Sequence, residues 1–335
     1  MVRTPMETAA TRFLAHTGAE VPLICGAMYP CSNPELVAAV SEAGGIGVVQ
    51  PISLTYVHGH ELREGLRLIK RLTSKPVGFN AIIEKGSKIY LDRMRRWLDV
   101  ALEEGVRFVI TALGDPRWVV ERVHAVGGVV YHDVTERRFA DKAIEAGVDG
   151  LICVNDRAGG HAGNRSPQAL YDELSDLGLP LVCAGGVGDE RDFARALELG
   201  YEAVQLGTRF IATRECRAHD DYKRAILRAR ERDIVLTDKI SGVPVSVIRT
   251  PYIEALGTRA NPLMRRLLRH PRTKHTVRAL YSLRSIWQLK RASLRGTGYR
   301  DYFQAGKSVE TIDEIEPAAE IVKRFAAAQL GREAS

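Results

Sequence analysis

A single histidine, His161, stands among small residues in the stretch DRAGGHAGNRS (residues 156–166). It directly follows Ala158, Gly159 and Gly160, none of which is large enough to bury an imidazole ring. Imidazole ordinarily has a pKa of about 6.5, so it can remove a proton from a carbon acid near neutral pH and release it in the same turnover. His161 is therefore our candidate catalytic base. The alternatives are a cap for the following helix and a hydrogen bond to a loop carbonyl.

Two further glycine-rich stretches follow apolar runs. CAGGVGDERDF contains Gly185 and Gly186, and QLGTRF contains Gln205, Gly207 and Thr208. Glycine has no Cβ atom, so backbone N–H groups there can approach an anion, and a threonine hydroxyl at a helix start can donate to it. The pair predicts a phosphate site; the alternative is two tight turns. Neither a GxGxxG fingerprint nor a Walker sequence is present, which favours a mononucleotide such as FMN.

Polar residues occur near the ends of two other apolar runs. Asn80 lies in one of them, and His132 and Asp133 end another. The second pair could face a bound cofactor or simply close a strand, and both interpretations stay open. No group of residues has the spacing of a metal site, and the five cysteines form no CxxC pair. We expect neither a metal site nor a disulfide.

Apolar runs alternate with helix-like segments along most of the chain. Short runs without strict alternation are typical of strands buried on both faces, and eight strand–helix repeats favour a closed (β/α)₈ TIM barrel. Active sites of such barrels lie at the carboxyl ends of the strands, where the candidates above fall. The runs are residues 21–28, 45–50, 75–83, 106–112, 127–134, 149–155, 180–187 and 202–210.

The repeat stops near residue 230. We expect the barrel in residues 1–230 and a cap or lid in residues 231–310. Residues 311–335 should dock on the barrel through one helix, near 314–330. The chain has 335 residues and a formal charge of +7, and residues 255–300 hold 12 of its 48 Lys and Arg residues and no acidic residue. This stretch predicts one or two amphipathic helices with a cationic face.

The charge and the apolar pattern limit the partners. A cationic cap could be merely solvated or could attract an acidic partner, but no binding module accompanies it, so we expect no nucleic acid. No apolar run is long enough for a membrane span, and the first residues lack the apolar core of a signal peptide, which predicts a cytoplasmic protein. A homodimer stays open.

Five stretches together resemble the nitronate monooxygenase family, formerly called the 2-nitropropane dioxygenases. They are AGGHAG, CAGGVGDERDFARALELGYEAVQLGTRFIATRE, the pair YK, DKISGVPVSVIRTP and FQAGKSVETI. The resemblance spans nearly the whole chain and is weakest over the basic stretch. It implies an FMN-dependent TIM barrel, and a related branch contains flavin-dependent enoyl-acyl-carrier-protein reductases. Here Asn155-Asp156-Arg157 precede AGGH where many relatives carry Glu or Gly, which predicts charges near the site entrance.

The resemblance also implies roles for individual residues. The turn after the first strand and Asn80 would contact the flavin, the glycines near 185 and 207 would hold its phosphate, and His161 would be the base. The expected cofactor-binding residues are Gly26, Ala27, Met28, Asn80, His132, Asp133, Ala158, Gly159, Gly160, Gly185, Gly186, Gln205, Gly207 and Thr208.

The reaction that the resemblance implies is oxidation of alkyl nitronates or nitroalkanes by O2 to a carbonyl compound and nitrite. Two alternatives stay open. One is an NAD(P)H-dependent reductase of a quinone or an enoyl-acyl-carrier-protein, in which the basic cap would contact an acidic carrier. The other is a flavin-bearing binding protein with a basic contact surface.

Overall fold

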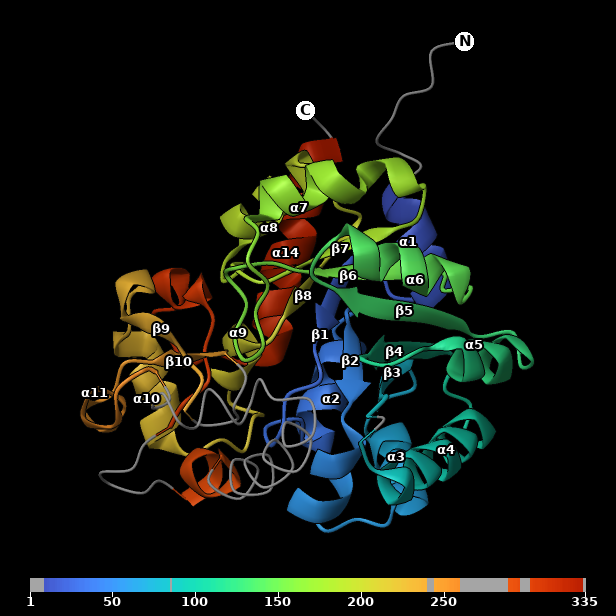
Figure 1. Ribbon diagram of the computed structural model, residues 1–335, viewed down its shortest axis with the longest axis horizontal. Helices are drawn as coiled ribbons and strands as arrows, with labels where there is room; N and C mark the ends of the chain where they lie inside the picture. Colours follow the sequence, from blue (N-terminus) through green and yellow to red (C-terminus); the bar gives the residue numbers. More distant parts are fainter. Residues whose placement is uncertain (1–8, 85, 240–243, 260–288, 296–301, 334–335) are drawn as a thin grey trace.

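The computed structural model describes residues 9–84, 86–239, 244–259, 289–295 and 302–333. Eight parallel strands close into a barrel in sequence order, with helices around it (Figure 1). The fold is the (β/α)₈ TIM barrel that the eight apolar runs predicted. The strands are β1 Leu23–Cys25, β2 Ile46–Val49, β3 Val77–Ile82, β4 Phe108–Ala112, β5 Val129–Val134, β6 Gly150–Val154, β7 Leu181–Ala184 and β8 Ala203–Leu206.

Alternate residues of each strand point into the barrel, and the rest point to the helices. The interior is a compact apolar cluster that includes Ile24, Ile110, Tyr131, Ile152 and Val182. The outward-facing residues belong to a second, larger cluster shared with the helices. Because both faces of each strand are covered, the strands read in the sequence as short apolar runs without strict alternation.

The barrel is closed at its amino end by a helix that the sequence did not predict, α1 (Ala9–Thr17). Phe13 of α1 is fully buried and packs edge-on against Phe108 and Tyr131, with ring centroids 6.4 and 6.1 Å away. The imidazole of His16 adds a hydrogen bond to the Tyr131 hydroxyl, 3.0 Å from Nδ1. These contacts fill the amino end and leave the carboxyl end for a site.

Helices follow the strands and cover the barrel. Those after β1 to β7 are α2 Pro34–Glu42, α3 Leu62–Leu72, α4 Lys88–Glu103, α5 Arg117–His124, α6 Arg137–Glu145, α7 Pro167–Leu174 and α8 Glu190–Glu198. After β8 come a short helix, α9 (Thr208–Ile211), and α10 (Asp220–Arg228). The interpretation of 202–210 as one strand was therefore too long, because the chain turns into α9 after Gly207.

Past α10 the chain forms a small hairpin of β9 (Ile234–Thr237) and β10 (Val245–Ile248), followed by α11 (Pro251–Leu256). The sequence pattern did not reveal this hairpin. Residues 289–295 are helical, but most of the basic stretch lies outside the described residues. The division of the chain at residues 230 and 310 stays a prediction.

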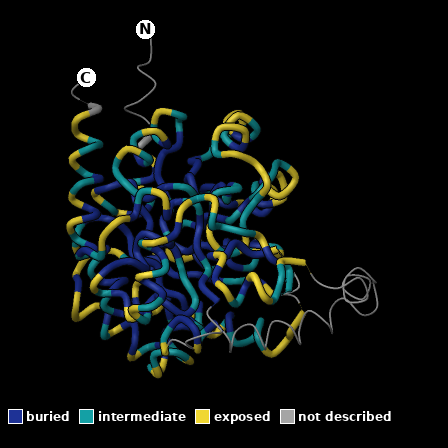
Figure 2. The backbone as a smooth tube through the Cα atoms, turned by 90° about the vertical axis from the view of Figure 1, so that its left-hand side faces the viewer, coloured by how far each residue is buried: buried dark blue, intermediate teal, exposed yellow. Residues whose placement is uncertain are grey.

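The last helix, α14 (Ala318–Glu333), begins and ends a few residues later than predicted and packs against α8 and α2. The rings of Phe325 and Phe193 lie 5.0 Å apart at this contact. Buried backbone runs through the middle of the molecule and exposed backbone lies on the outer turns (Figure 2). No helix within the described ranges is both long and apolar enough to span a membrane.

Candidate functional site

The barrel is filled at depth and open at its carboxyl end. On β4, the inward-facing Ile110 is buried, whereas Ala112 at the end of the strand is partly exposed. On β6, Ile152 is fully buried and Val154 is partly exposed. Accessible surface on inward-facing residues means that the last layer of the barrel lines a space. This is the end at which (β/α)₈ enzymes carry their active sites.

His161 lies in the loop after β6, and that loop is attached to the hairpin. Gly160 and Ser246 of β10 exchange backbone hydrogen bonds, with N–O distances of 3.4 Å from Gly160 and 2.7 Å from Ser246. The helix that follows is capped by Ser166, whose Oγ accepts from the amide of Ala169. No described residue hydrogen-bonds the imidazole of His161. The two structural alternatives for this histidine, helix cap and loop contact, therefore find no support.

The imidazole of His161 is also suited to accept a proton. His161 as a whole is exposed to solvent, although the neighbouring protein removes some water from its ring. This partial burial lowers the pKa of His161 below its ordinary value. At neutral pH the ring is mainly neutral, with a free nitrogen lone pair, which is the form that a general base needs.

The glycines after β7 and β8 present unused donors. Among the described residues, the amide N–H groups of Gly185, Gly186 and Gly207 donate to no other group. The hydroxyl oxygen of Thr208 accepts from the amide of Gly306 at 3.0 Å, so its own proton stays available. Four donors at the ends of neighbouring strands fit a phosphate.

The turn after β1 lies beside these glycines. The amide of Gly26 donates to the carbonyl of Leu206 at 3.0 Å, which ties the end of β1 to β8. A Cβ atom on Gly26 would lie 3.0 Å from Cγ of Gln205, so the turn packs directly on that side chain. A Cβ atom on Gly207 would lie 3.5 Å from Sδ of Met28, which is an ordinary contact distance. Asn80 is 7% exposed and lies beside Ile110 in the β3–β4 register, on the inward face.

Two buried polar atoms in the barrel have no partner among the described residues, Oδ1 of Asp133 and Oε1 of Gln205. Both side chains point inward, because Asp133 lies opposite Ile152 and Gln205 opposite Ile24 in the strand register. Buried polar atoms are normally hydrogen-bonded, so an unpartnered pair in an open barrel end indicates a bound group that supplies the partners. The residues present therefore fit a mononucleotide with a polar ring.

His132 lies on the other face of β5 from Asp133. It is 6% exposed, and its Nδ1 is 2.8 Å from Oγ1 of Thr111 on β4. Burial lowers the pKa of His132 to about 4, so the ring is neutral. This placement favours the strand-closing interpretation of His132 and offers no cation for a cofactor. The cofactor contact expected of Asp133 stays a prediction.

Asn155 is a site residue whose role the sequence did not reveal. It is fully buried, and its Nδ2 donates to the carbonyl of Gly185 at 3.0 Å, while its Oδ1 accepts from the amide of Arg157 at 2.9 Å. The side chain thus joins the loop that carries His161 to the loop that carries the phosphate-facing glycines. Gln50, directly after β2, is a buried polar residue with a local role; it is 3% exposed and its Oε1 accepts from the amide of Ser53.

The segment around residue 306 closes the site from the C-terminal part of the chain. Gly306 packs so tightly on Gly159 that a Cβ atom on either would lie less than 3 Å from the backbone of the other. The amide of Lys307 donates to the carbonyl of Arg157 at 2.9 Å. The motif FQAGKSVETI carried part of the family resemblance, but its contacts are with residues about 150 positions earlier in the sequence, which no local pattern indicates.

The charged residues before the AGGH stretch pair with residues of other segments. Arg157 makes a two-pronged contact with Glu231, with N–O distances of 3.0 and 2.8 Å. Nζ of Lys307 lies 3.5 Å from Glu231 and 3.7 Å from Asp156. The hydrogen bond from Arg157 lowers the pKa of Glu231. This group of two basic and two acidic side chains is therefore balanced in charge; its position at the site entrance stays a prediction.

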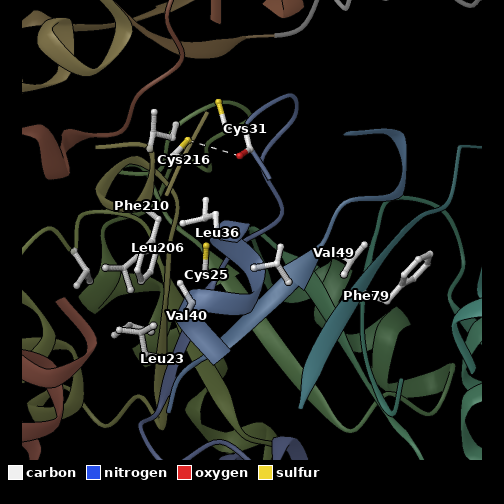
Figure 3. Packing of buried hydrophobic residues seen from close by; sticks show 14 of the residues in the cluster. Leu23, Cys25, Cys31, Leu36, Val40, Val49, Phe79, Leu206, Phe210 and Cys216 are labelled. Atoms are coloured by element: carbon white, nitrogen blue, oxygen red, sulfur yellow. Dashed lines mark hydrogen bonds between the residues drawn. The ribbon is translucent and has the colours of Figure 1, made fainter. Parts of the chain in front are cut away.

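The five cysteines are free thiols, all buried. Cys25 lies in the packed layer between β1 and α2, and Cys31 and Cys216 lie near each other above it (Figure 3). Burial raises the pKa of Cys25 well above its ordinary value, so this thiol is inert. Within the described residues no group of His, Cys, Asp and Glu could hold a metal ion.

The family model described as nitronate monooxygenase matches residues 11–327. The chain belongs to this family. It is therefore an oxidoreductase built on a (β/α)₈ barrel.

Three relatives show the range of the family. The chain is 29% identical over 280 residues to a Rhodococcus jostii (3aS,4S,5R,7aS)-5-hydroxy-7a-methyl-1-oxo-octahydro-1H-indene-4-carboxyl-CoA dehydrogenase, covering 83% of this chain and 76% of the relative. A probable nitronate monooxygenase of Staphylococcus saprophyticus is 28% identical, with 74% and 81% covered. The structure of FabK from Thermotoga maritima superposes with a TM-score of 0.78 and 30% identity, covering 100% and 99%.

Proposed function

We propose that this protein is an FMN-dependent oxidoreductase that oxidises nitroalkanes or alkyl nitronates with O2 to a carbonyl compound and nitrite, with His161 as the general base. The observation that carries the proposal is the state of His161. Its imidazole is at the open end of the barrel, has a lowered pKa and is engaged by no described residue. A histidine kept neutral and unpartnered at this end is poised to remove a proton from a substrate carbon.

The residues that would hold FMN fall into two groups. The amides of Gly185, Gly186 and Gly207 and the hydroxyl of Thr208 would bind the phosphate, since all four donors are available. The ring would lie over the turn at residues 26–28, within reach of the inward-facing side chains of β3, β5 and β8. FMN, when bound, supplies the electron acceptor that no side chain of the chain provides.

The chain's own residues perform the remaining steps. The α-carbon of a nitroalkane is acidic because the nitro group delocalises the negative charge, so a base can break the C–H bond. His161 takes that proton on its free nitrogen and becomes an imidazolium beside the nitronate that forms. The hairpin contact at Gly160 fixes the loop, which holds the imidazole in place for the transfer.

A direct test separates proton removal from the later steps. His161→Ala should retain FMN, because the phosphate donors are on other loops, and should lose about 10²–10⁴-fold in turnover of a neutral nitroalkane. Turnover of the preformed nitronate should fall far less, since no proton has to be removed. Equal losses on both substrates would contradict the role of His161 as a base.

A second candidate is oxidation or reduction next to an acyl thioester. It is favoured by the Rhodococcus jostii relative, whose name describes a dehydrogenase of an indene-carboxyl-CoA. The hydrogen α to a thioester carbonyl is also acidic, so His161 could serve as base or, in the reverse direction, as proton donor. NAD(P)H would be the electron donor in a reductase, and an acidic acyl carrier would suit the basic stretch.

Anaerobic titration of the purified flavoprotein distinguishes the candidates. Bleaching of the flavin spectrum by a nitronate alone supports the first proposal. Rapid bleaching by NADH or NADPH supports a reductase, and bleaching by a saturated acyl-CoA supports a dehydrogenase. Retention of flavin without reduction by any of these donors would support a flavin-bearing binding protein instead.

A further inference from the structure

Asp133 is a buried carboxyl group without a compensating charge. It lies on the inward face of β5 and is paired with Ile152 of β6 in the strand register. On the other side, Ala112 is the β4 residue that follows the pair of Thr111 and His132. Neither neighbour can donate a hydrogen bond through its side chain. Oδ1 of Asp133 has no partner among the described residues, yet the residue keeps some accessible surface. Asp133 thus has accessible surface near the barrel end, while its Oδ1 is itself buried and lacks a hydrogen-bond partner in the described part of the chain.

Gln205 of β8 is, like Asp133 of β5, an inward-facing polar residue with a buried atom that lacks a partner among the described residues. Its Oε1 is likewise buried and unpartnered, and its side chain is held from one side by the turn at Gly26. Between the two residues, the inward positions of β6 and β7 carry Val154 and Ala184, which offer no polar group. Both polar side chains therefore point to the inside of the barrel.

The surroundings of Asp133 determine its charge. Burial raises its pKa to about 7, and no nearby charged group opposes this effect. His132 on the same strand points the other way and stays neutral, and His161 contributes no interaction. A neutral carboxylic acid can donate one hydrogen bond and accept another, whereas a carboxylate can only accept.

We propose that Asp133 contacts the flavin as a neutral carboxylic acid and donates its O–H to a carbonyl oxygen of the flavin's pyrimidine ring, with the amide of Gln205 facing the same ring. The inference rests on the proposed FMN binding. The pyrimidine edge of a flavin alternates carbonyl oxygens with an N–H group, so it needs donors and acceptors together. A protonated Asp133 and the side-chain amide of Gln205 each offer a hydrogen-bond donor and an acceptor.

Flavin binding through a neutral Asp133 would depend on pH. Above neutral pH, Asp133 must lose its proton to become a carboxylate, and a carboxylate repels the carbonyl oxygen that the acid would bind. The affinity for the flavin should therefore fall as pH rises through the pKa of Asp133. Well above that pKa, the loss should approach about tenfold per pH unit if only the neutral form binds.

The test measures flavin binding by the apoprotein, through quenching of flavin fluorescence, from about pH 6 to about pH 9. Binding of riboflavin is measured in parallel with binding of FMN. Riboflavin has no phosphate group, so ionisation of a phosphate cannot contribute to the pH dependence of its binding. For the wild type we expect the affinity for both flavins to fall by at least tenfold over this range. Asp133→Asn, which keeps a donor and cannot ionise, should bind with nearly constant affinity. Asp141→Asn, on the exposed face of α6, is the matched control and should follow the wild type.

Each result decides the matter. If the wild type binds flavin with an affinity that does not change with pH, or if Asp133→Asn keeps the wild-type slope, the role of Asp133 is refuted while FMN binding stands. If neither flavin binds at any pH, the proposed cofactor is wrong and this inference falls with it. Thermal unfolding of each variant at neutral pH shows that the comparison is between folded proteins.

Discussion

Replacing Asn155 by alanine tests whether the two loops of the site depend on one buried side chain. The wild-type side chain satisfies the carbonyl of Gly185 and the amide of Arg157, at 3.0 and 2.9 Å. Asn155→Ala leaves both backbone groups without their partner. One unsatisfied buried polar group costs about 1–3 kcal/mol, so the loss of two partners should lower the free energy of unfolding by about 2–6 kcal/mol. Binding of FMN should weaken as well, because the glycine loop and the His161 loop would lose their common anchor.

Urea unfolding of the apoprotein gives the stability, and fluorescence titration gives the FMN affinity. The matched control is Asn164→Ala, which removes the same side chain from an exposed position of the same loop. It should change stability by no more than about 0.5 kcal/mol. If Asn155→Ala is as stable as the control, the two hydrogen bonds do not hold the loops, and the reasoning about this residue is wrong.

Two other substitutions follow from the same structure. Asp133→Asn should remove a pH dependence of stability. The pKa of Asp133 is about 7 in the folded protein and 3.8 ordinarily, so the folded state holds its proton more tightly than the unfolded state does. The free energy of unfolding of the wild type should therefore fall, relative to the variant, by up to about 4 kcal/mol from about pH 4 to about pH 7, and change little above that. Denaturant titrations at several pH values measure this, and parallel curves would contradict it. Gly207→Ala should unfold like the wild type, since its Cβ meets nothing closer than 3.5 Å, yet weaken FMN binding, whereas Gly185→Ala should be unstable because its Cβ would lie 2.5 Å from the amide nitrogen of Ala158. Urea unfolding and FMN titration of both variants separate the two effects, and an unstable Gly207→Ala would refute the distinction.

The barrel could be predicted from sequence because each strand is buried on both faces. Such strands read as short apolar runs, and eight of them between helical segments leave few other architectures. The hairpin of β9 and β10 was missed for the opposite reason. Val235 and Leu236 of β9 are not fully buried, and the strand gains its partner from β10, so its own pattern is weak. Helix α1 was missed because its one decisive residue, Phe13, acts by filling the barrel and not by a helical repeat.

The strand ends at which the candidate residues lie could be predicted, but not which of their side chains point into the barrel. Adjacent residues of a strand point to opposite faces, so His132 and Asp133 could not both look into the barrel. The sequence pattern alone did not assign the faces, and the strand register does. The sequence also could not show which segments contact the loops of the site. Gly306 lies 147 positions after Gly159 in the sequence, and the two meet only through the tertiary fold.

The glycines show how far sequence reasoning about such a site can go. All of them were expected to let a phosphate approach, but the structure gives them different reasons. Gly185 and Gly186 have positive φ angles, +119° and +83°, and a Cβ atom on Gly186 would meet the side chain of Arg157 at 2.6 Å. The fold itself therefore requires glycine at both positions. Gly207 has an ordinary φ of −114°, and a Cβ atom there would make only ordinary van der Waals contacts with Met28, so folding does not exclude alanine. Its lack of a side chain is best explained by something that approaches its backbone from outside the chain, which makes Gly207 a more specific indicator of a bound phosphate than the two glycines that stand out more in the sequence.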